Sequence, residues 1–289
     1  MPKVIGILEL KNYLMPLLLY QFFRVLKYEL QKIPDIIELV DVARSSEPAR
    51  PKIVMDVTDF KFLNEIINEG NFDFIINCIG ILNATAEDNP DQAILVNAYL
   101  PHFLERVTKK FSTRIIHLST DCVFSGTKGG YIETDLKDGD GFYGQSKALG
   151  ELDNDKDLTI RTSIIGPDLN LDGVGLFNWF IQQKGLINGF TNAYWSGITT
   201  IQLAKSVIEV IFLKEKLTGI YHLTNNEKIN KFSLLILFQQ VFEKRDTKIA
   251  ESENYKVDKS LVNTRDDFQL EIPTYHQMIM EMKQWMENQ

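Results

Sequence analysis

Residues 117–126 read HLSTDCVFSG, and residues 143–147 read YGQSK. The first stretch follows the β-branched pair Ile115 and Ile116 and places hydroxyl side chains where a buried strand would end. The second has the character of a helix start, on which Tyr143 and Lys147, four residues apart, share one face. A hydroxyl, a phenol and an ammonium group that converge at a strand end are suited to proton transfer. The two stretches therefore predict a strand, a loop and a helix that carry a catalytic centre.

The expected chemistry centres on Tyr143. A phenol has an unperturbed pKa of about 10, and a neighbouring ammonium group such as that of Lys147 favours the phenolate and lowers this pKa. Tyr143 would then act as an acid near neutral pH, while a threonine or serine hydroxyl holds the substrate oxygen that receives the proton. A chain with 10 tyrosines also produces such a spacing by chance, so the surrounding motifs decide between the two interpretations.

Three motifs surround these residues: STDxVFxG at 119–126, GGYxExD at 129–135 and YGxSKxxGE at 143–151. Together they resemble the extended short-chain dehydrogenase/reductase superfamily, and within it the dTDP-4-dehydrorhamnose reductase branch of sugar-nucleotide reductases. The resemblance extends over nearly the whole chain and is poor at the N-terminus. It implies an NADP- or NAD-dependent oxidoreductase that reduces a 4-keto nucleotide-deoxysugar in the biosynthesis of surface polysaccharides.

Short apolar runs alternate with helical patterns along the chain. The expected strands are Val4–Leu8, Ile36–Val40, Ile53–Met55, Phe72–Cys78, Arg114–Leu118, Leu158–Thr162 and Gly219–Leu223. Such alternation predicts βαβ units and a parallel sheet. The expected fold class is α/β, a doubly wound, Rossmann-like parallel sheet with a smaller C-terminal substrate-binding lobe. We expect the dinucleotide-binding domain at 1–165, with 201–223 returning to it, and the substrate-binding lobe at 166–200 and 224–289.

Two regions between these runs have weaker patterns. The residues that follow the fourth strand, up to Pro90, are polar and predict a loop. The stretch from Asp168 to Gly197 is rich in glycine, asparagine and aromatic residues and shows few strand signals. We expect this second stretch to form part of the substrate pocket.

The resemblance implies roles for individual residues. Thr120 would orient the substrate, Tyr143 would donate the proton, and Lys147 would lower the pKa of the tyrosine and hold the nicotinamide ribose. The implied cofactor-binding residues are Arg44, Asp56, Asn77, Gly80, Ser119, Tyr143 and Lys147. The implied substrate-binding residues are Asp121, Val123, Asn178, Trp179, Lys184 and Trp195.

Several of these roles have alternatives. Arg44 would pair with the 2′-phosphate of NADP, since a guanidinium suits a phosphate, but an arginine after a strand is also common at surfaces. Asn97 matches a helical asparagine of the superfamily and is equally explained by helix packing or by hydrogen bonding to a loop. The aromatic residues of the lobe could form its core, and Lys184 could simply be solvated.

The first turn departs from the family pattern. Residues 8–14 read LELKNYL, without the glycines that a pyrophosphate-binding turn requires. Glu9 would repel a phosphate, and Lys11 and Asn12 would compensate only through side chains. We therefore expect the dinucleotide to bind weakly, in an altered pose, or not at all. The alternative function is a degenerate, non-catalytic sugar-nucleotide-binding or regulatory protein, and a third is an epimerase.

Composition limits the remaining classes. The 289 residues carry a net charge of −8, which argues against non-specific nucleic-acid binding. Cys78 and Cys122 form no CxxC pair, which favours a reducing cytoplasm and no structural metal. The apolar run Tyr13–Leu26 is interrupted by polar residues and is too short for a membrane span, so it predicts a buried helix. The expected partner is a nucleotide sugar, and a homodimer is compatible with the resemblance.

Overall fold

The structure is a computed structural model that describes residues 2–7, 22, 25–30, 37–43, 53–167 and 175–288. The turn at 8–14, Arg44 and Asp168 lie outside these residues, and so does most of the apolar run from Tyr13 to Leu26. The described residues of that run, Phe22, Val25 and Leu26, are helical, as expected, and the helix continues to residue 30. Among the described residues, no helix combines the length and apolar character that a membrane crossing requires.

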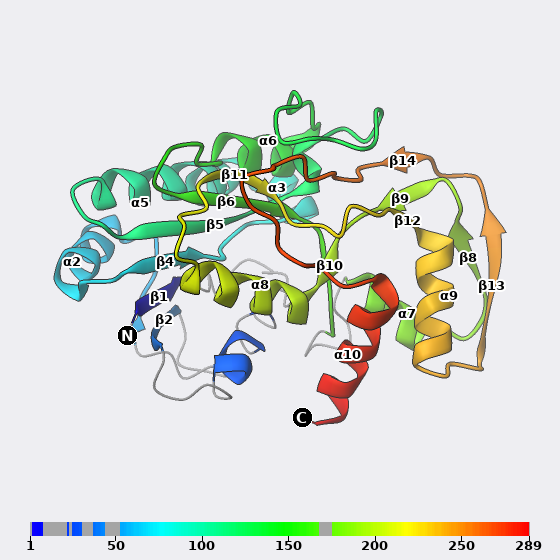
Figure 1. The fold of residues 1–289 in the computed structure, drawn as a ribbon. Helices are drawn as coiled ribbons and strands as arrows, with labels where there is room; N and C mark the ends of the chain where they lie inside the picture. Colours follow the sequence, from blue (N-terminus) through cyan, green and yellow to red (C-terminus); the bar gives the residue numbers. More distant parts are fainter. Residues whose placement is uncertain are drawn as a thin grey trace.

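The centre of the fold is a parallel sheet with the strand order β3-β2-β1-β4-β5-β6-β11 (Figure 1). Its strands are β1 Lys3–Ile7, β2 Glu38–Ala43, β3 Ile53–Val54, β4 Phe74–Asn77, β5 Arg114–Thr120, β6 Leu158–Thr162 and β11 Gly219–His222. The order reverses between β1 and β4, and sheets of this kind bind ligands beyond the carboxyl ends of their strands at such a point. The doubly wound parallel α/β fold is therefore confirmed, including the return of β11 to the sheet.

Successive residues of the central strands pack into two different hydrophobic clusters, one on each face of the sheet. Ile75 and Ile115 pack with α2 and α5 on one face of the sheet, whereas Ile76 and Ile116 pack with α8 on the other. This alternation follows from the two-residue period of a β-strand. Figure 1 shows the resulting layers, with α2, α5 and α6 on one side and α8 on the other. The bounds of these helices are α2 Phe60–Gly70, α5 Leu100–Thr108, α6 Gly141–Leu149 and α8 Thr200–Phe212.

The region between β4 and α5 differs from the expected loop. A short helix, α3, spans Asn83–Asp88, and α4 Pro90–Ala93 runs through a π-helical turn, η1 Ile94–Tyr99, into α5. The prediction of a loop up to Pro90 was therefore wrong. Only Ala86 of α3 is buried, so its sequence lacks the apolar period by which an amphipathic helix is identified.

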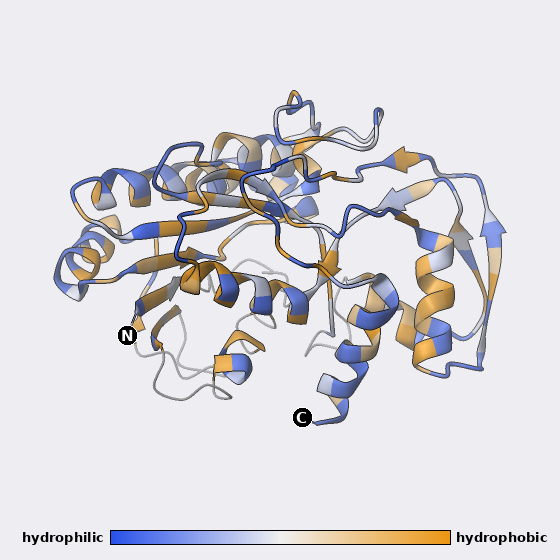
Figure 2. Ribbon diagram, viewed as in Figure 1, coloured by the Kyte–Doolittle hydropathy of each residue, from blue (hydrophilic) through white to orange (hydrophobic). Residues whose placement is uncertain are grey.

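The other elements include β7 Ile164–Ile165, α7 Leu176–Gln182, β8 Gly185–Phe190, β9 Ala193–Trp195, β10 Ile198–Thr199, β12 Ile229–Asn230, β13 Thr247–Ser252, β14 Val257–Asp258 and α10 Tyr275–Glu287. Of these, β8, β9, β12, β13 and α10 contact α9 Lys231–Val241, which is largely hydrophobic in Figure 2. One hydrophobic cluster runs from the central sheet through α8 to α9 and α10. The domain boundaries expected at 165 and 224 stay a prediction.

The expected shortage of strands before Gly197 was wrong, because β8 and β9 lie there. The partner of β8 is β13, some sixty residues later in the chain. Half of the residues of β8 are exposed, and its sequence contains two glycines, so it has neither the alternation nor the β-branched content of a typical strand.

Candidate active site

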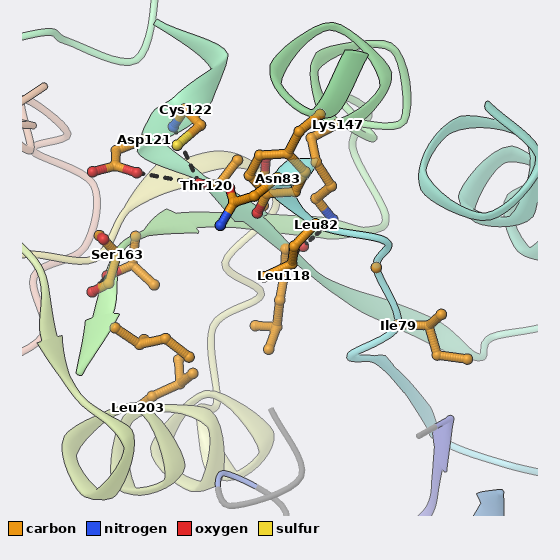
Figure 3. Close-up of a pocket in the computed structure, with 15 residues that line it drawn as sticks. Ile79, Leu82, Asn83, Leu118, Thr120, Asp121, Cys122, Lys147, Ser163 and Leu203 are labelled. Carbon is orange, nitrogen blue, oxygen red and sulfur yellow. Dashed lines mark hydrogen bonds between the residues drawn. The ribbon is translucent and has the colours of Figure 1, made fainter. Parts of the chain in front are cut away.

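The end of β5 and the first turns of α6 form the candidate active site (Figure 3). Thr120 is the last residue of β5, while Tyr143 and Lys147 lie on α6. All three line one cavity of about 210 Å³. The structure thus brings together the hydroxyl, the phenol and the amine whose meeting the sequence predicts.

Two glycines allow α6 to approach the neighbouring backbone closely. A Cβ atom at Gly144 would overlap the carbonyl oxygen of Cys122, directly after β5. A Cβ atom at Gly150, the C-cap of the helix, would overlap the carbonyl oxygen of Asn97 in η1. Any larger residue would push the helix outward, so these contacts set how near Tyr143 lies to the end of β5.

The Thr120 hydroxyl forms hydrogen bonds with two neighbouring residues. Its oxygen accepts a hydrogen bond from the Cys122 N–H at 3.1 Å and donates to Asp121 Oδ1 at 3.2 Å. The phenol of Tyr143 lines the same cavity, and the Thr120 hydroxyl acts to lower its pKa. A substrate oxygen placed between Thr120 and Tyr143 would therefore find two hydroxyl groups.

The pKa of Tyr143 departs from the expectation. Burial raises the pKa of the phenol, the charges of Cys122 and Asp121 raise it further, and the Thr120 hydrogen bond opposes them. The lowering of this pKa by Lys147 was therefore wrong for this structure. The physical reason is the orientation of the lysine, whose Nζ donates to the Leu118 carbonyl oxygen at 2.6 Å (Figure 3).

The amine of Lys147 lies in the protein interior. The residue is 4% exposed, and its Nζ also lies 3.4 Å from His117 Nε2. Burial lowers the pKa of Lys147 to about 8, against the raising effect of Glu151 and Cys78. Both the ammonium and the amine carry N–H donors, so the Lys147 Nζ group can hold a ribose hydroxyl at the cavity as the resemblance implies.

A buried ion pair between Arg161 and Glu151 links the end of α6 to the central sheet. Arg161 of β6 contacts Glu151 through Nε to Oε1 at 2.7 Å and Nη2 to Oε2 at 2.8 Å. Ser119 lines the cavity, but its hydroxyl donates to Glu151 Oε1 at 2.7 Å. Burial alone would raise the pKa of Glu151, but the hydrogen bonds and charge of Arg161, with the Ser119 hydroxyl and Lys137, hold it below its usual value. The pair fixes the end of α6 to β5 and β6.

The other expected cofactor residues occupy different positions. Gly80 lines the cavity with its backbone. Asn77 at the end of β4 is fully buried and contacts His117, so its side chain lies behind the cavity and does not open into it. Asp56 accepts from the backbone N–H and hydroxyl of Thr58 and does not line this cavity. Asn97 forms hydrogen bonds with both backbone groups of Ile81 and thus holds the loop after β4, which favours the interpretation as a loop-bonding amide.

A second cavity of about 970 Å³ adjoins the first, and both are lined by Asp121, Cys122 and Ser163. Trp179 and Trp195, two of the expected substrate residues, line the second cavity. Burial raises the pKa of Asp121, and the charges of Lys259 and Lys231 act in the opposite direction. The larger cavity therefore combines aromatic walls with two lysines that lie near the reactive end.

Three of the expected substrate residues lie elsewhere. Val123 is fully buried in a cluster of its own: Val123, Phe124, Tyr131 and Leu261. Asn178 is buried on the inner side of α7 and Lys184 is exposed, and neither lines the second cavity. These assignments were not supported by the geometry, because neighbouring residues of a helix or turn face different directions.

The sequence reasoning missed Lys231 and Lys259. Lys231 begins α9 directly after its cap, Asn230, and burial lowers the pKa of Lys231 to about 8 while Asp121 raises it. Lys259 lies in the segment after β14 and lines the same cavity. Neither lysine belongs to a motif, and both reach Asp121 only through tertiary packing.

The first cavity would hold the nicotinamide end of a dinucleotide but not the whole molecule, since its volume falls below the range of about 300–1,000 Å³ for complete ligand pockets. The Gly80 backbone and Lys147 fit this role, because they present close backbone approach and an ammonium donor to the cavity. The remainder of a dinucleotide would extend over the carboxyl ends of β1 and β2.

Comparisons with known proteins agree with this geometry. The family described as RmlD substrate binding domain matches residues 29–264. A dTDP-4-dehydrorhamnose reductase of Mycobacterium tuberculosis is 39% identical over 102 residues. This match covers 33% of this chain and 33% of that protein. The reductase of the same name from Aggregatibacter actinomycetemcomitans is 28% identical over 221 residues, covering 71% of this chain and 74% of that protein. The crystal structure of dTDP-4-dehydrorhamnose reductase from Bacillus anthracis in complex with NADP covers 100% of both chains, with a TM-score of 0.79 and 20% identity, and shows a shared fold.

Proposed function

The chain belongs to the RmlD substrate binding domain family, and from this membership we propose that it reduces the 4-keto group of a nucleotide-linked deoxysugar with NADP or NAD as cofactor. The reaction would serve the biosynthesis of surface polysaccharides in the cytoplasm, where the free thiols of Cys78 and Cys122 would persist. The relatives named dTDP-4-dehydrorhamnose reductase support the nature of the substrate.

The observation that carries the proposal is the junction of the two cavities. Thr120, Tyr143 and Lys147 line the smaller cavity, which meets the larger one at Asp121, Cys122 and Ser163. A ketone at this junction would lie beside the phenol, with its sugar and nucleotide in the larger cavity. There, Trp179 offers a stacking surface, and Lys231 and Lys259 supply cationic side chains.

The chain contributes proton transfer and orientation. When bound, the nicotinamide supplies a hydride to the carbonyl carbon. Thr120 donates a hydrogen bond to the carbonyl oxygen, and Tyr143 transfers its phenol proton to that oxygen as negative charge develops. The raised pKa of Tyr143 keeps the phenol protonated at neutral pH. The same shift makes the phenol a weaker acid, so the proton is transferred only as the substrate oxygen gains the basicity of an alkoxide. Lys147, which lines the same cavity, would hold and orient the cofactor ribose.

The proposal is tested by incubating the full chain with NADPH or NADH and a 4-keto-6-deoxysugar linked to dTDP or UDP. We expect oxidation of the cofactor only when the ketosugar is present, followed by its absorbance, and a reduced sugar in the product mixture. An isomerised sugar without net loss of the cofactor would favour the epimerase instead. Nucleotide-sugar binding without any conversion would favour the non-catalytic alternative.

Cofactor affinity is a separate prediction. The sequence at 8–14 lacks the glycines whose backbone N–H groups would bind the pyrophosphate. Losing two charge-assisted hydrogen bonds, at roughly 1.5–3 kcal/mol each, would weaken binding by about two to four orders of magnitude. We expect calorimetry with NADPH to give a Kd in the high micromolar range or weaker. A low-micromolar Kd would show that this turn binds the dinucleotide by other means.

A further inference from the structure

The side chain of His117 lies behind Lys147 in the middle of β5. It is fully buried and does not line the cavity. Its Nε2 lies 3.4 Å from Lys147 Nζ, and its Nδ1 lies 3.1 Å from the amide nitrogen of Asn77. The mechanism above uses neither His117, which contacts Lys147, nor Asn77, which contacts His117.

The backbone fixes the orientation of the Asn77 amide. The Ile79 N–H donates to Asn77 Oδ1 at 3.3 Å, and an N–H group is satisfied only by an acceptor. The Nδ2 group of Asn77 therefore faces His117 as a donor, which requires an unprotonated, accepting Nδ1. Burial, together with the charges of Lys147 and His102, holds the pKa of His117 well below its usual value, so the ring is neutral. Its single hydrogen then lies on Nε2 and faces Lys147.

We propose that Asn77 and His117 form a hydrogen-bonded relay that positions Lys147 and favours its unprotonated amine. An Nε2–H group donates to the lone pair of a neutral amine, whereas it opposes an ammonium group, which presents only hydrogens. The Leu118 carbonyl accepts a hydrogen from either form of the lysine. His117 is therefore a positioning residue that acts through Lys147, and the lysine can exchange its proton near neutral pH.

The other titratable groups around the lysine come from several elements. Burial has the largest effect on the pKa of Lys147, and Glu151 after α6 and Cys78 after β4 both act to raise it. Glu151 is in turn paired with Arg161 of β6. His102 of α5 acts on His117 rather than on the lysine. The relay adds a directional hydrogen bond to this balance of burial and charge.

The tautomer is tested by nitrogen NMR of the full chain labelled at histidine, without cofactor or substrate. The His117 signals are assigned by their loss in His117→Met. We expect Nδ1 to have the chemical shift of an unprotonated ring nitrogen and Nε2 that of an N–H group. The reverse tautomer, or a protonated ring at neutral pH, would overturn the proposal.

The effect on the lysine is tested by carbon NMR of lysine-labelled protein, in which the Lys147 signal is identified by its loss in Lys147→Met. We expect His117→Met to raise the proton affinity of Lys147 by roughly tenfold or more. Asn77→Asp, which offers an acceptor to Nδ1 and reverses the tautomer, should act in the same direction. Ile116→Val alters packing on the same strand without touching the relay and should leave the titration unchanged.

An unchanged Lys147 titration in both relay variants, or an equal shift in Ile116→Val, would refute the relay. If His117→Met does not fold, Asn77→Asp and the tautomer decide the question. The significance of the relay for turnover rests on the proposed function, but these measurements require no turnover. A failure of the relay and a failure of the proposed function are therefore distinguishable.

Discussion

Tyr143→Phe should lower kcat by about 10²–10⁴-fold, which is the usual contribution of a general acid. The substitution removes the phenol hydroxyl and keeps the ring that packs against the core between α5 and the sheet. We therefore expect the affinity for the nucleotide sugar to stay within a few-fold of the wild-type value. Steady-state turnover of the 4-keto substrate, with calorimetry of the nucleotide sugar, measures the two effects separately.

Tyr99→Phe provides the matched control. Tyr99 lies in η1, is 41% exposed, and lines neither of the two cavities. Removing its hydroxyl deletes a hydrogen bond from Arg106 but should leave kcat within a few-fold. Wild-type-like turnover in Tyr143→Phe would refute the assignment of the proton donor, since no other described tyrosine lines the smaller cavity with Thr120.

Arg161→Met should lower the free energy of unfolding by about 3–5 kcal/mol, the usual cost of leaving a buried charge without its partner. Arg161 is 1% exposed, and its guanidinium donates to both oxygens of Glu151 and to the Glu133 carbonyl oxygen. Lys137, 3.2 Å from Glu151 Oε2 and partly exposed, remains in the variant and favours the lower end of that range. Urea unfolding followed by circular dichroism gives the measurement.

Two further variants control this result. Lys128→Met breaks an ion pair with Asp135 in which the lysine is 54% exposed, so it should cost no more than about 1 kcal/mol. The double variant Arg161→Met with Glu151→Leu replaces both charges by apolar side chains and should recover much of the lost stability. If Arg161→Met cost as little as Lys128→Met, the buried pair would not be a main support of α6.

The central sheet could be predicted because its strands carry local signals. The strand Leu158–Thr162 was predicted with both ends correct, since its sequence LTIRT alternates apolar with polar residues and is rich in β-branched side chains. The cap of α2 was equally local: Asp59 accepts a hydrogen bond from the Phe62 N–H. In contrast, β8 is stabilised by pairing with β13, and nothing near β8 in the sequence encodes that partner.

In the site, too, residues placed by local sequence signals could be predicted, and residues placed by distant packing could not. Thr120, Tyr143 and Lys147 could be predicted from motifs because a strand end and the next helix hold all three. Val123 was assigned to the substrate because it belongs to the same motif, but the turn η2 Asp121–Val123 directs its side chain into a hydrophobic cluster. Lys231 joins the site from more than eighty residues away, which only the folded structure reveals.

The backbone contacts of α6 at Gly144 and Gly150 have a consequence for the rate of the reaction. Both contacts join main chain to main chain, so the position of the helix does not depend on a side-chain rotamer. The ordering of Tyr143 beside Thr120 is therefore completed during folding, before any ligand arrives. Catalytic groups that are pre-organised in this way lose little further entropy on reaching the transition state, and this saving can account for a large part of an enzyme's acceleration.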